Sequence, residues 1–269
     1  MSSGASLGAF SWKHCNVLAI IEALLAGLFI GSVLGFVGAG GAMVSVPILL
    51  YIFHFTNNQA TVAALVIVAA AAASGLIPKL KTREVLIREA LIIWGIGLIT
   101  TLSMTALAPH LPENFIHVGF AMVLVAAGAS MLRKPLTLHP EKQISPLWLV
   151  GISLAVGTMT GLFGVGGGFL AIPILVLFFH TPLNKAAGTS LLIIAMNSAT
   201  SFIERFSSWH TITWKIPIII SITAIAMSRY ASAKSPNVNV KALRRAFAFL
   251  LFSLALFTLW KIGHTTSAK

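Results

Sequence analysis

Long apolar runs dominate the chain, and polar residues are confined to short stretches between them. The apolar runs fall at 17–37, 42–54, 60–78, 90–108, 114–132, 147–164, 169–180, 186–203, 216–228 and 243–260. A helix that crosses a bilayer needs roughly 20 such residues, within a range of about 17–25. Seven runs reach that length, and the short ones are 42–54, 169–180 and 216–228. This pattern predicts an all-α polytopic membrane protein with 8–10 helices, some of them short.

The composition agrees with a membrane protein. Hydrophobic residues make up 57% of the chain and charged residues 9%, whereas soluble domains carry about 25% charged residues. The net charge of +12 does not point to nucleic acid, because the cations lie in short loops beside apolar runs. Lys and Arg in such loops set membrane topology. We therefore expect a multi-pass protein whose surroundings are the lipid bilayer.

An internal repeat divides the chain into two membrane halves. With a shift of 126 residues, GSVLGFVGAGGAMVSVPILLYIFH (31–54) aligns with GTMTGLFGVGGGFLAIPILVLFFH (157–180), and 10 of 24 positions are identical. The repeat predicts an N-terminal tail, a first membrane half, a polar linker, a second membrane half and a C-terminal tail, at 1–16, 17–132, 133–146, 147–261 and 262–269.

The basic residues indicate that the two halves are inverted relative to each other. In the first half, the loop after the third run carries four basic residues between 79 and 88, and the loop after the fourth run carries none. In the second half the bias reverses, with five basic residues between 229 and 245, after the ninth run. Such a reversal is typical of inverted repeats with an odd number of crossings. We expect five segments per half, a cytoplasmic linker and both termini outside.

Glycine clusters precede the short runs in both halves and are the main candidates for substrate binding. They comprise Gly38, Gly40, Gly41, Gly164, Gly166, Gly167 and Gly168. Irregular backbone within a membrane is tolerated only where protein buries it or it lines a cavity. Amides freed at the start of a half-helix, aided by the helix dipole, bind anions. The alternative is close helix packing, which accounts well for Gly27, Gly31 and Gly35 but poorly for consecutive glycines.

Other polar candidates within the runs are few. On the eighth run, substrate binding and interhelical hydrogen bonding are both open for Thr189, Ser190 and Asn197. His54 and His180 end the short runs and are candidates for proton coupling, because histidine titrates near neutral pH. An interfacial role is the alternative for both. Glu22 is a further coupling candidate, since acids inside a membrane are functional by default.

The chain resembles a known family of membrane permeases. The paired glycine-rich segments with their prolines, AAGTSL at 186–191 and the closing NVKALRRAFAFLLFSLALFTLWK are similar to the TauE/SafE sulfite exporter family. This resemblance implies transport of small sulfur-containing anions, such as sulfite or organosulfonates, or of other organic anions. It also implies a location in the inner cell membrane and a Thr-Ser pair after each short helix. The second half has this pair at Thr189 and Ser190, but the aligned residues of the first half are Ala63 and Ala64.

We therefore expect a secondary transporter of small anions that works by alternating access between the two halves. No G-K-[ST] ending follows the glycines, so phosphate binding of the P-loop type is excluded. The single cysteine, Cys15, excludes an internal disulfide, and we expect neither a metal nor a cofactor. A non-transporting scaffold is the alternative. An intramembrane enzyme is less favoured, because the chain has no Asp, HExxH or GxSxG. Assembly into a homo-oligomer stays open.

Overall fold

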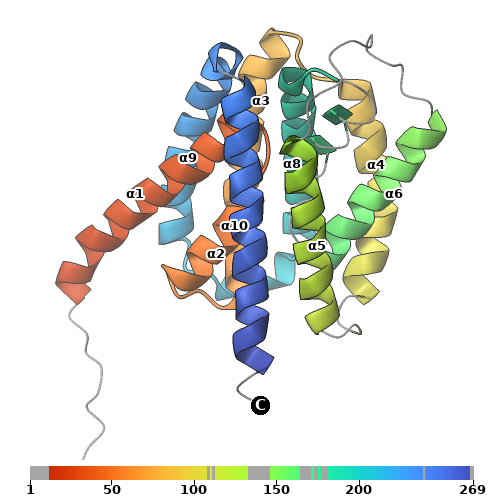
Figure 1. Ribbon diagram of the computed structural model, residues 1–269. Helices are drawn as coiled ribbons and strands as arrows, with labels where there is room; N and C mark the ends of the chain where they lie inside the picture. The colour runs from red at the N-terminus through yellow and green to blue at the C-terminus, as the bar shows by residue number, and fades with distance from the viewer. Residues whose placement is uncertain are drawn as a thin grey trace, which may run out of the picture.

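The computed structural model describes residues 12–107, 110, 113–132, 146–163, 171–172, 175–176, 181–238 and 240–266. Within them every regular element is helical. The α-helices are α1 (Trp12–Val37), α2 (Gly41–Tyr51), α3 (Asn57–Lys81), α4 (Ile87–Leu107), α5 (Glu113–Leu132), α6 (Pro146–Phe163), α8 (Leu183–Glu204), α9 (Lys215–Lys234) and α10 (Val240–Thr266). Two 3-10 helices follow α8 and α9, namely η2 (Phe206–Thr211) and η3 (Ser235–Asn237). The all-helical prediction is confirmed (Figure 1).

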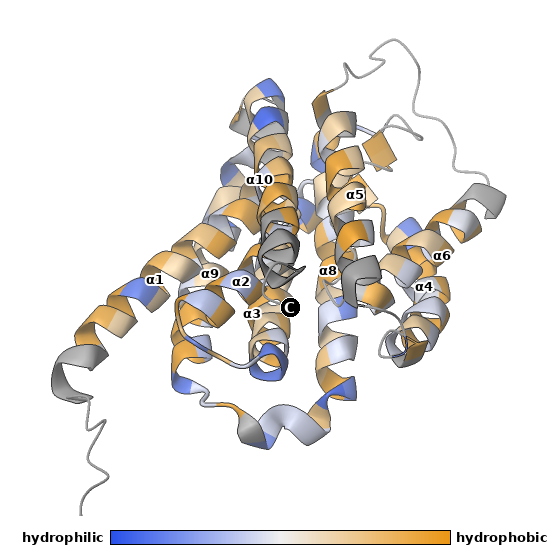
Figure 2. Cartoon of the chain, turned by 60° about the horizontal axis from the view of Figure 1, so that its bottom comes forward, coloured by the Kyte–Doolittle hydropathy of each residue, from blue (hydrophilic) through white to orange (hydrophobic). Residues whose placement is uncertain are grey.

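Several helices are built to face lipid. Within the described residues, five are long and apolar enough to cross a membrane: α1, α3, α4, α8 and α9. Large apolar side chains stay exposed on the outer helices, for example Ile99, Met122 and Phe249. Hydrophobic residues cover most of each helix, and hydrophilic residues gather near the helix ends (Figure 2). Such broad apolar exposure marks a surface that contacts a membrane or a partner, and the lengths favour a membrane.

Three element boundaries differ from the sequence-based prediction. The short run 216–228 belongs to α9, which has 20 residues and extends to Lys234. The helix continues beyond the apolar run because small Ser and Ala residues there pack against α1 and α3. Helix α1 begins at Trp12, within the predicted tail, and α10 ends at Thr266, beyond 261. Most of the predicted linker, residues 133–145, lies outside the described residues.

Helices α1 and α2 form a hairpin that turns back inside the bundle. The chain bends at residues 38–40, and α2 then runs back toward the end of the molecule where α1 begins (Figure 1). Helix α2 has 11 residues, which is about 16 Å and too short for a bilayer core of about 30 Å. At its end Tyr51 contacts Phe257 near the end of α10, with ring centroids 5.4 Å apart. The short run 42–54 therefore turns back within the bundle and is too short to cross a membrane by itself.

The helices of the two halves pack in matching pairs. We match α1, α3, α4 and α5 in order with α6, α8, α9 and α10. Helix α1 then packs on α9 as α6 packs on α4, and α3 packs on α9 as α8 packs on α4. Helices α3 and α8 contact each other at the centre, and they are the most buried of the candidate spans.

Close contacts between these pairs repeat in detail. A Cβ added to Gly35 on α1 would overlap the Ser228 carbonyl oxygen on α9, and one added to Gly161 on α6 would lie 2.5 Å from the Thr101 carbonyl oxygen on α4. Gly161 follows Gly35 by 126 residues, and Ser228 follows Thr101 by 127. A second matched set of contacts joins Gly31 to Ala224 and Gly157 to Gly97. These glycines allow close helix approach, as the packing alternative expects.

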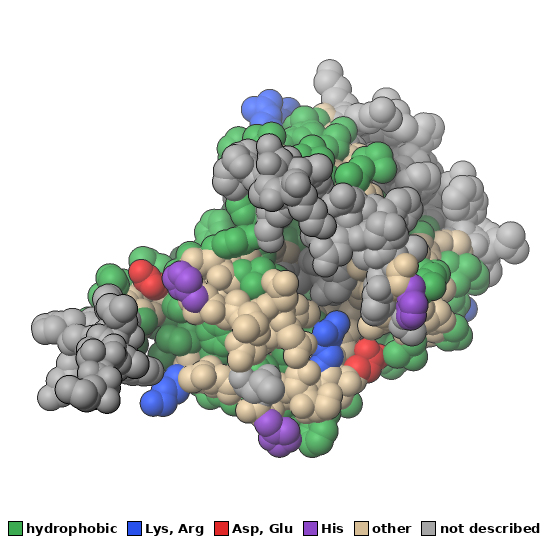
Figure 3. Space-filling view, turned by 90° about the horizontal axis from the view of Figure 1, so that it is seen from below, with side chains coloured by type: hydrophobic (Ala, Val, Ile, Leu, Met, Phe, Trp, Pro, Cys, Tyr) green, Lys and Arg blue, Asp and Glu red, His purple; other side chains and the backbone are tan. Residues whose placement is uncertain are grey.

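Charge is distributed unevenly between the two ends of the bundle. The basic end is formed by the ends of α3 and α9 and the starts of α4, α8 and α10, at the top of Figure 1. Among the described residues it carries Lys79, Lys81, Arg83, Arg88, Lys185, Arg229, Lys234, Lys241 and Arg245. The opposite end holds the start of α1, η2 and the end of α10. Seen from that end, Lys and Arg side chains are sparse (Figure 3).

Candidate functional site

The glycine cluster of the first half makes the bend between α1 and α2. Gly38 and Gly40 have φ angles of 79° and 87°, in the left-handed region that side chains disfavour. A Cβ at Gly38 would lie 2.6 Å from the Ala187 backbone on α8, and one at Gly41 would overlap Leu34. Gly40 precedes α2 without a side-chain cap, and Gly38, Gly40 and Gly41 are all buried. The start of α2 is therefore a buried, uncapped helix N-terminus.

The second glycine cluster, formed by Gly164, Gly166, Gly167 and Gly168, lies outside the described residues, as does His180. The chain after it repeats a contact of the first half. The Thr181 amide donates to the Leu175 carbonyl at 3.1 Å, as the Phe55 amide donates to the Leu49 carbonyl at 3.0 Å.

The two coupling candidates of the first half lie away from the glycine bend. His54 is exposed and follows α2 with a φ of 55°, so its backbone forms the turn that ends the helix. Glu22 is half-buried on α1, four turns before the bend. The structure does not bring His54 or Glu22 together with Gly38 and Gly40.

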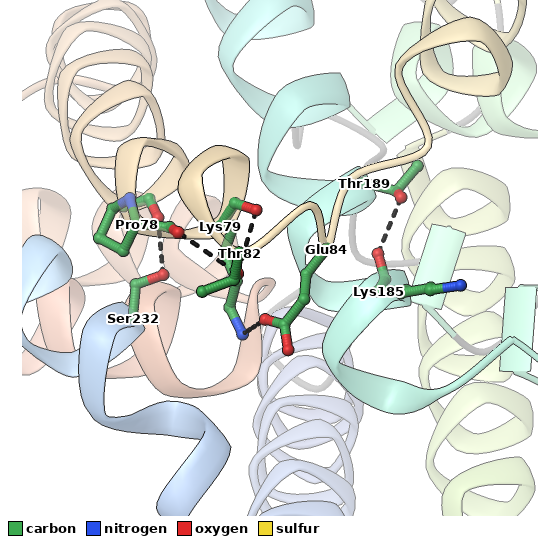
Figure 4. Close-up of polar contacts among 8 residues, drawn as sticks. Pro78, Lys79, Thr82, Glu84, Lys185, Thr189 and Ser232 are labelled. Atoms are coloured by element: carbon green, nitrogen blue, oxygen red, sulfur yellow. Dashed lines mark hydrogen bonds and ion pairs between the residues drawn. The ribbon is translucent and has the colours of Figure 1, made fainter.

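The polar residues at the start of α8 are buried and anchor a loop. Thr189 and Ser190 are 0% exposed and Asn197 is 9% exposed. The Thr189 hydroxyl accepts from the Leu86 amide at 3.0 Å. It donates to the Lys185 carbonyl at 2.8 Å (Figure 4). One residue earlier, the missing side chain of Gly188 leaves room for the Glu84 carbonyl. The AAGTSL segment thus docks the loop between α3 and α4, residues 82–86, onto α8.

A buried ion pair within this loop was missed by the sequence analysis. Lys79 Nζ lies 2.8 Å from Glu84 Oε2, and the Lys79 side chain is only 1% exposed. The backbone around it forms a Schellman motif, in which Glu84 N donates to Lys79 O at 2.9 Å and Arg83, with a φ of 56°, donates to Leu80 O at 3.2 Å. From the sequence, Lys79 is only one of the cations expected to set topology. A Lys five residues before a Glu gives no sequence signal of burial.

Serine hydroxyls from α9 lie beside the same end of α3. Ser232 donates to the Gly75 carbonyl at 2.6 Å, one turn before Lys79, and Figure 4 shows Ser232 next to the end of α3 that carries the ion pair. Ser228 Oγ, also beside Gly75, is buried without a hydrogen-bond partner. We call the set of Lys79, Glu84, Ser228 and Ser232 the basic-end cluster.

The described residues contain no group of three or more His, Cys, Asp or Glu side chains placed to hold a metal ion. The candidate groups are the buried amides of the glycine bend, the buried hydroxyls on α8 and α9, and Lys79, which is paired with Glu84. Groups of this kind bind anions through hydrogen bonds and charge.

Five candidate membrane spans among the described residues, and a short helix that turns back after a glycine bend, define a multi-pass integral membrane protein. Comparison with known families makes this more specific. The family model described as "Sulfite exporter TauE/SafE" matches residues 23–258, so the chain belongs to that family.

Curated relatives carry transporter names. The chain is 24% identical to a "Probable membrane transporter protein" of Xylella fastidiosa, over 91% of this chain and 97% of the relative. It is 22% identical to "Probable membrane transporter protein YdhB" of Bacillus subtilis, over 86% and 96%, and 25% identical to YunE of the same species, over 73% and 81%. No solved structure matches the chain.

Proposed function

We propose that the protein is a secondary permease for small anions, with sulfur-containing anions such as sulfite and short sulfonates as the first candidates. Its family supports a membrane transporter. The observation that supports an anionic substrate is the buried start of α2, where Gly38 and Gly40 bend the chain and no side chain caps the helix. Such amides and the helix dipole attract negative charge.

The substrate site in this proposal involves both halves. Gly38, Gly40 and Gly41 would act with their counterparts Gly164, Gly166, Gly167 and Gly168. Ser190 and Asn197, buried on α8, are polar groups for the same path. Thr189 contributes by fixing the loop, since its hydroxyl already bonds two backbone groups. Proton coupling through His54, His180 or Glu22 stays a prediction.

Alternating access in this proposal rests on two inverted halves. The matched packing of α1 on α9 and α6 on α4 supports it. So does the re-entrant hairpin, because α3, α4 and α5 then make three crossings, an odd number that inverts the next half. The positive-inside rule places the basic end in the cytoplasm, with the start of α1 and the end of α10 on the outside.

Uptake of radiolabelled sulfite into proteoliposomes tests the proposal. Saturable uptake that thiosulfate, a short sulfonate or a small carboxylate inhibits is expected, and an imposed pH gradient reports proton coupling. Gly40→Ala strains the bend and should lower uptake. Gly95→Ala is the matched control, because a Cβ there meets nothing within 4 Å. Normal uptake by Gly40→Ala at normal abundance would show that the bend does not contribute to anion transport. Absence of uptake of every anion would leave the scaffold alternative.

A further inference from the structure

Lys79 is buried where a lysine has an easy route to water. It lies in the last turn of α3, one of the candidate spans, and lysines near the ends of membrane helices usually extend toward the interface. Here the side chain turns inward and is 1% exposed, whereas its partner Glu84 is 20% exposed. The neighbouring Lys81 is exposed. Burial of Lys79 is therefore a property of its position and not of the helix end as a whole.

The loop does not need the ion pair for its fold. Its turn is held by backbone hydrogen bonds from Arg83 and Glu84 to the last turn of α3. The side chains that meet in a Schellman motif are commonly apolar, and replacing a buried ion pair by apolar residues of similar size is often neutral or stabilising. An apolar pair at Lys79 and Glu84 would serve the turn as well, so the charge calls for another explanation.

Buried hydroxyls lie along the same seam. Helices α3 and α9 run in the same direction, and Ser232 meets Gly75. One turn further along α3 is Lys79. Ser228 Oγ, beside Gly75, is buried without a partner, and an ammonium group has three donors. A buried cation beside buried hydroxyls suits a small oxyanion, which accepts several hydrogen bonds at once.

We propose that Lys79 is the fixed cation of a second anion site at the basic end, and that Glu84 is an internal carboxylate which occupies it until the transported anion takes its place. This inference rests on the proposed function and names a step in it. Glu84 is the partner that leaves, because it lies on a loop and is the more exposed of the two. The ligand is a small oxyanion such as sulfite or a short sulfonate.

Displacement of Glu84 would change the packing next to the glycine bend. Three consecutive residues of α8 join the two places: Ala187 contacts Gly38, Gly188 lies under the Glu84 carbonyl, and Thr189 holds the Leu86 amide. When an anion releases Glu84, the contact over Gly188 loosens next to the residue that packs on the bend. The basic-end cluster and the start of α2 thus act in sequence on one path.

The decisive variant removes both charges and keeps the volume, as Lys79→Met with Glu84→Leu. We expect normal membrane abundance and thermal stability, and a fall in kcat/KM for sulfite of about 10- to 100-fold, the loss expected for a hydrogen bond to a charged group. Lys81→Met is the matched control, an exposed cation two residues away, and should transport like the wild type. Wild-type transport by the double variant would overturn the inference and leave the pair a structural feature.

Glu84→Gln gives a second readout that does not depend on transport. It removes the competing charge, so sulfite should raise the thermal midpoint of the detergent-solubilised variant more than that of the wild type, and KM should fall. Equal shifts in both proteins would contradict the inference. If the wild type neither takes up nor is stabilised by sulfite, thiosulfate, a sulfonate or a carboxylate, the proposed function fails. Wild-type transport with unaffected variants defeats the second site alone.

Discussion

The α3–α4 loop at the basic end and the α8–α9 connection at the opposite end occupy matching places in the two halves, but different chemistry holds them. The first carries the Lys79–Glu84 pair and is docked on α8 by the Thr189 hydroxyl. The second is held by aromatic packing, with Phe202 stacked on Trp209 at 4.2 Å. The residue that matches Thr189 is Ala63.

This difference explains the missing hydroxyl of the first half. At the basic end, Leu86 N needs an acceptor from α8, and Thr189 supplies it. At the opposite end the matching amide, Ile212 N, donates to Trp209 O within η2 at 3.4 Å, so Ala63 has no amide to bind. The absence of a hydroxyl at Ala63 is thus linked to how the connecting loop folds. Charged contacts can yield to an anion, whereas stacked rings do not respond to one.

The largest loss of stability is expected from Gly188→Val. This change gives α8 a valine, as in α3, where the matched residue is Val62. A side chain there overlaps the Glu84 carbonyl and should push the α3–α4 loop off α8. We expect a loss of about 1–3 kcal/mol in the free energy of unfolding, measured by denaturant titration in mixed micelles. Unchanged stability would show that the loop is not docked as described.

Thr189→Ala should have the next largest effect. It leaves the partly buried Leu86 amide without this acceptor, at about 1–3 kcal/mol in the free energy of unfolding. Thr189→Ser keeps the hydroxyl and is the control, so it should retain most of the stability. If the two variants are equally stable, the hydroxyl does not hold the loop.

Trp209→Leu tests the aromatic end of the comparison. It removes the stack on Phe202 and the hydrogen bond from Trp209 Nε1 to Phe202 O. The aromatic contribution is about 0.5–1.5 kcal/mol beyond buried area. The stabilisation that sulfite gives, measured as a shift in thermal midpoint, should be the same as in the wild type. A smaller shift would mean that the opposite end also senses the anion.

Asn58→Ala should have the smallest effect on stability. It removes the exposed hydrogen bond from Asn58 Nδ2 to Ser208 Oγ, 3.0 Å long, at roughly 0.5 kcal/mol in the free energy of unfolding. Thermal unfolding in detergent measures it, with Asn57→Ala on the same turn as the control. A loss as large as that of Thr189→Ala would remove the contrast between the two ends.

Much of the fold follows from the sequence, because apolar run length and the repeated glycine segments report directly on helices and bends. Gly38 and Gly40 lie at the bend that their sequence predicts. The length of α9 was not predictable from hydropathy, because Ser228 and Ser232 look polar but face the glycines of neighbouring helices.

The basic-end cluster and the contact that docks the loop were harder to predict from the sequence. The partner of Thr189 is Leu86, 103 residues away, and no local sequence pattern indicates such a contact. Lys79 resembles any cation that follows a membrane span. Its burial arises only when α9 and the α3–α4 loop close over the end of α3, which is a property of packing.

Alternating access at the two ends is the central claim, and spin-label distances test it most directly. With Cys15 replaced by serine, one label pair would join Arg83 to Lys234 at the basic end, and a second would join Asn57 to Ser207 at the opposite end. Electron–electron resonance in proteoliposomes would be measured with and without saturating sulfite. The account predicts that sulfite lengthens the first distance and leaves the second unchanged or shorter. Two distances that no transported anion alters would contradict it.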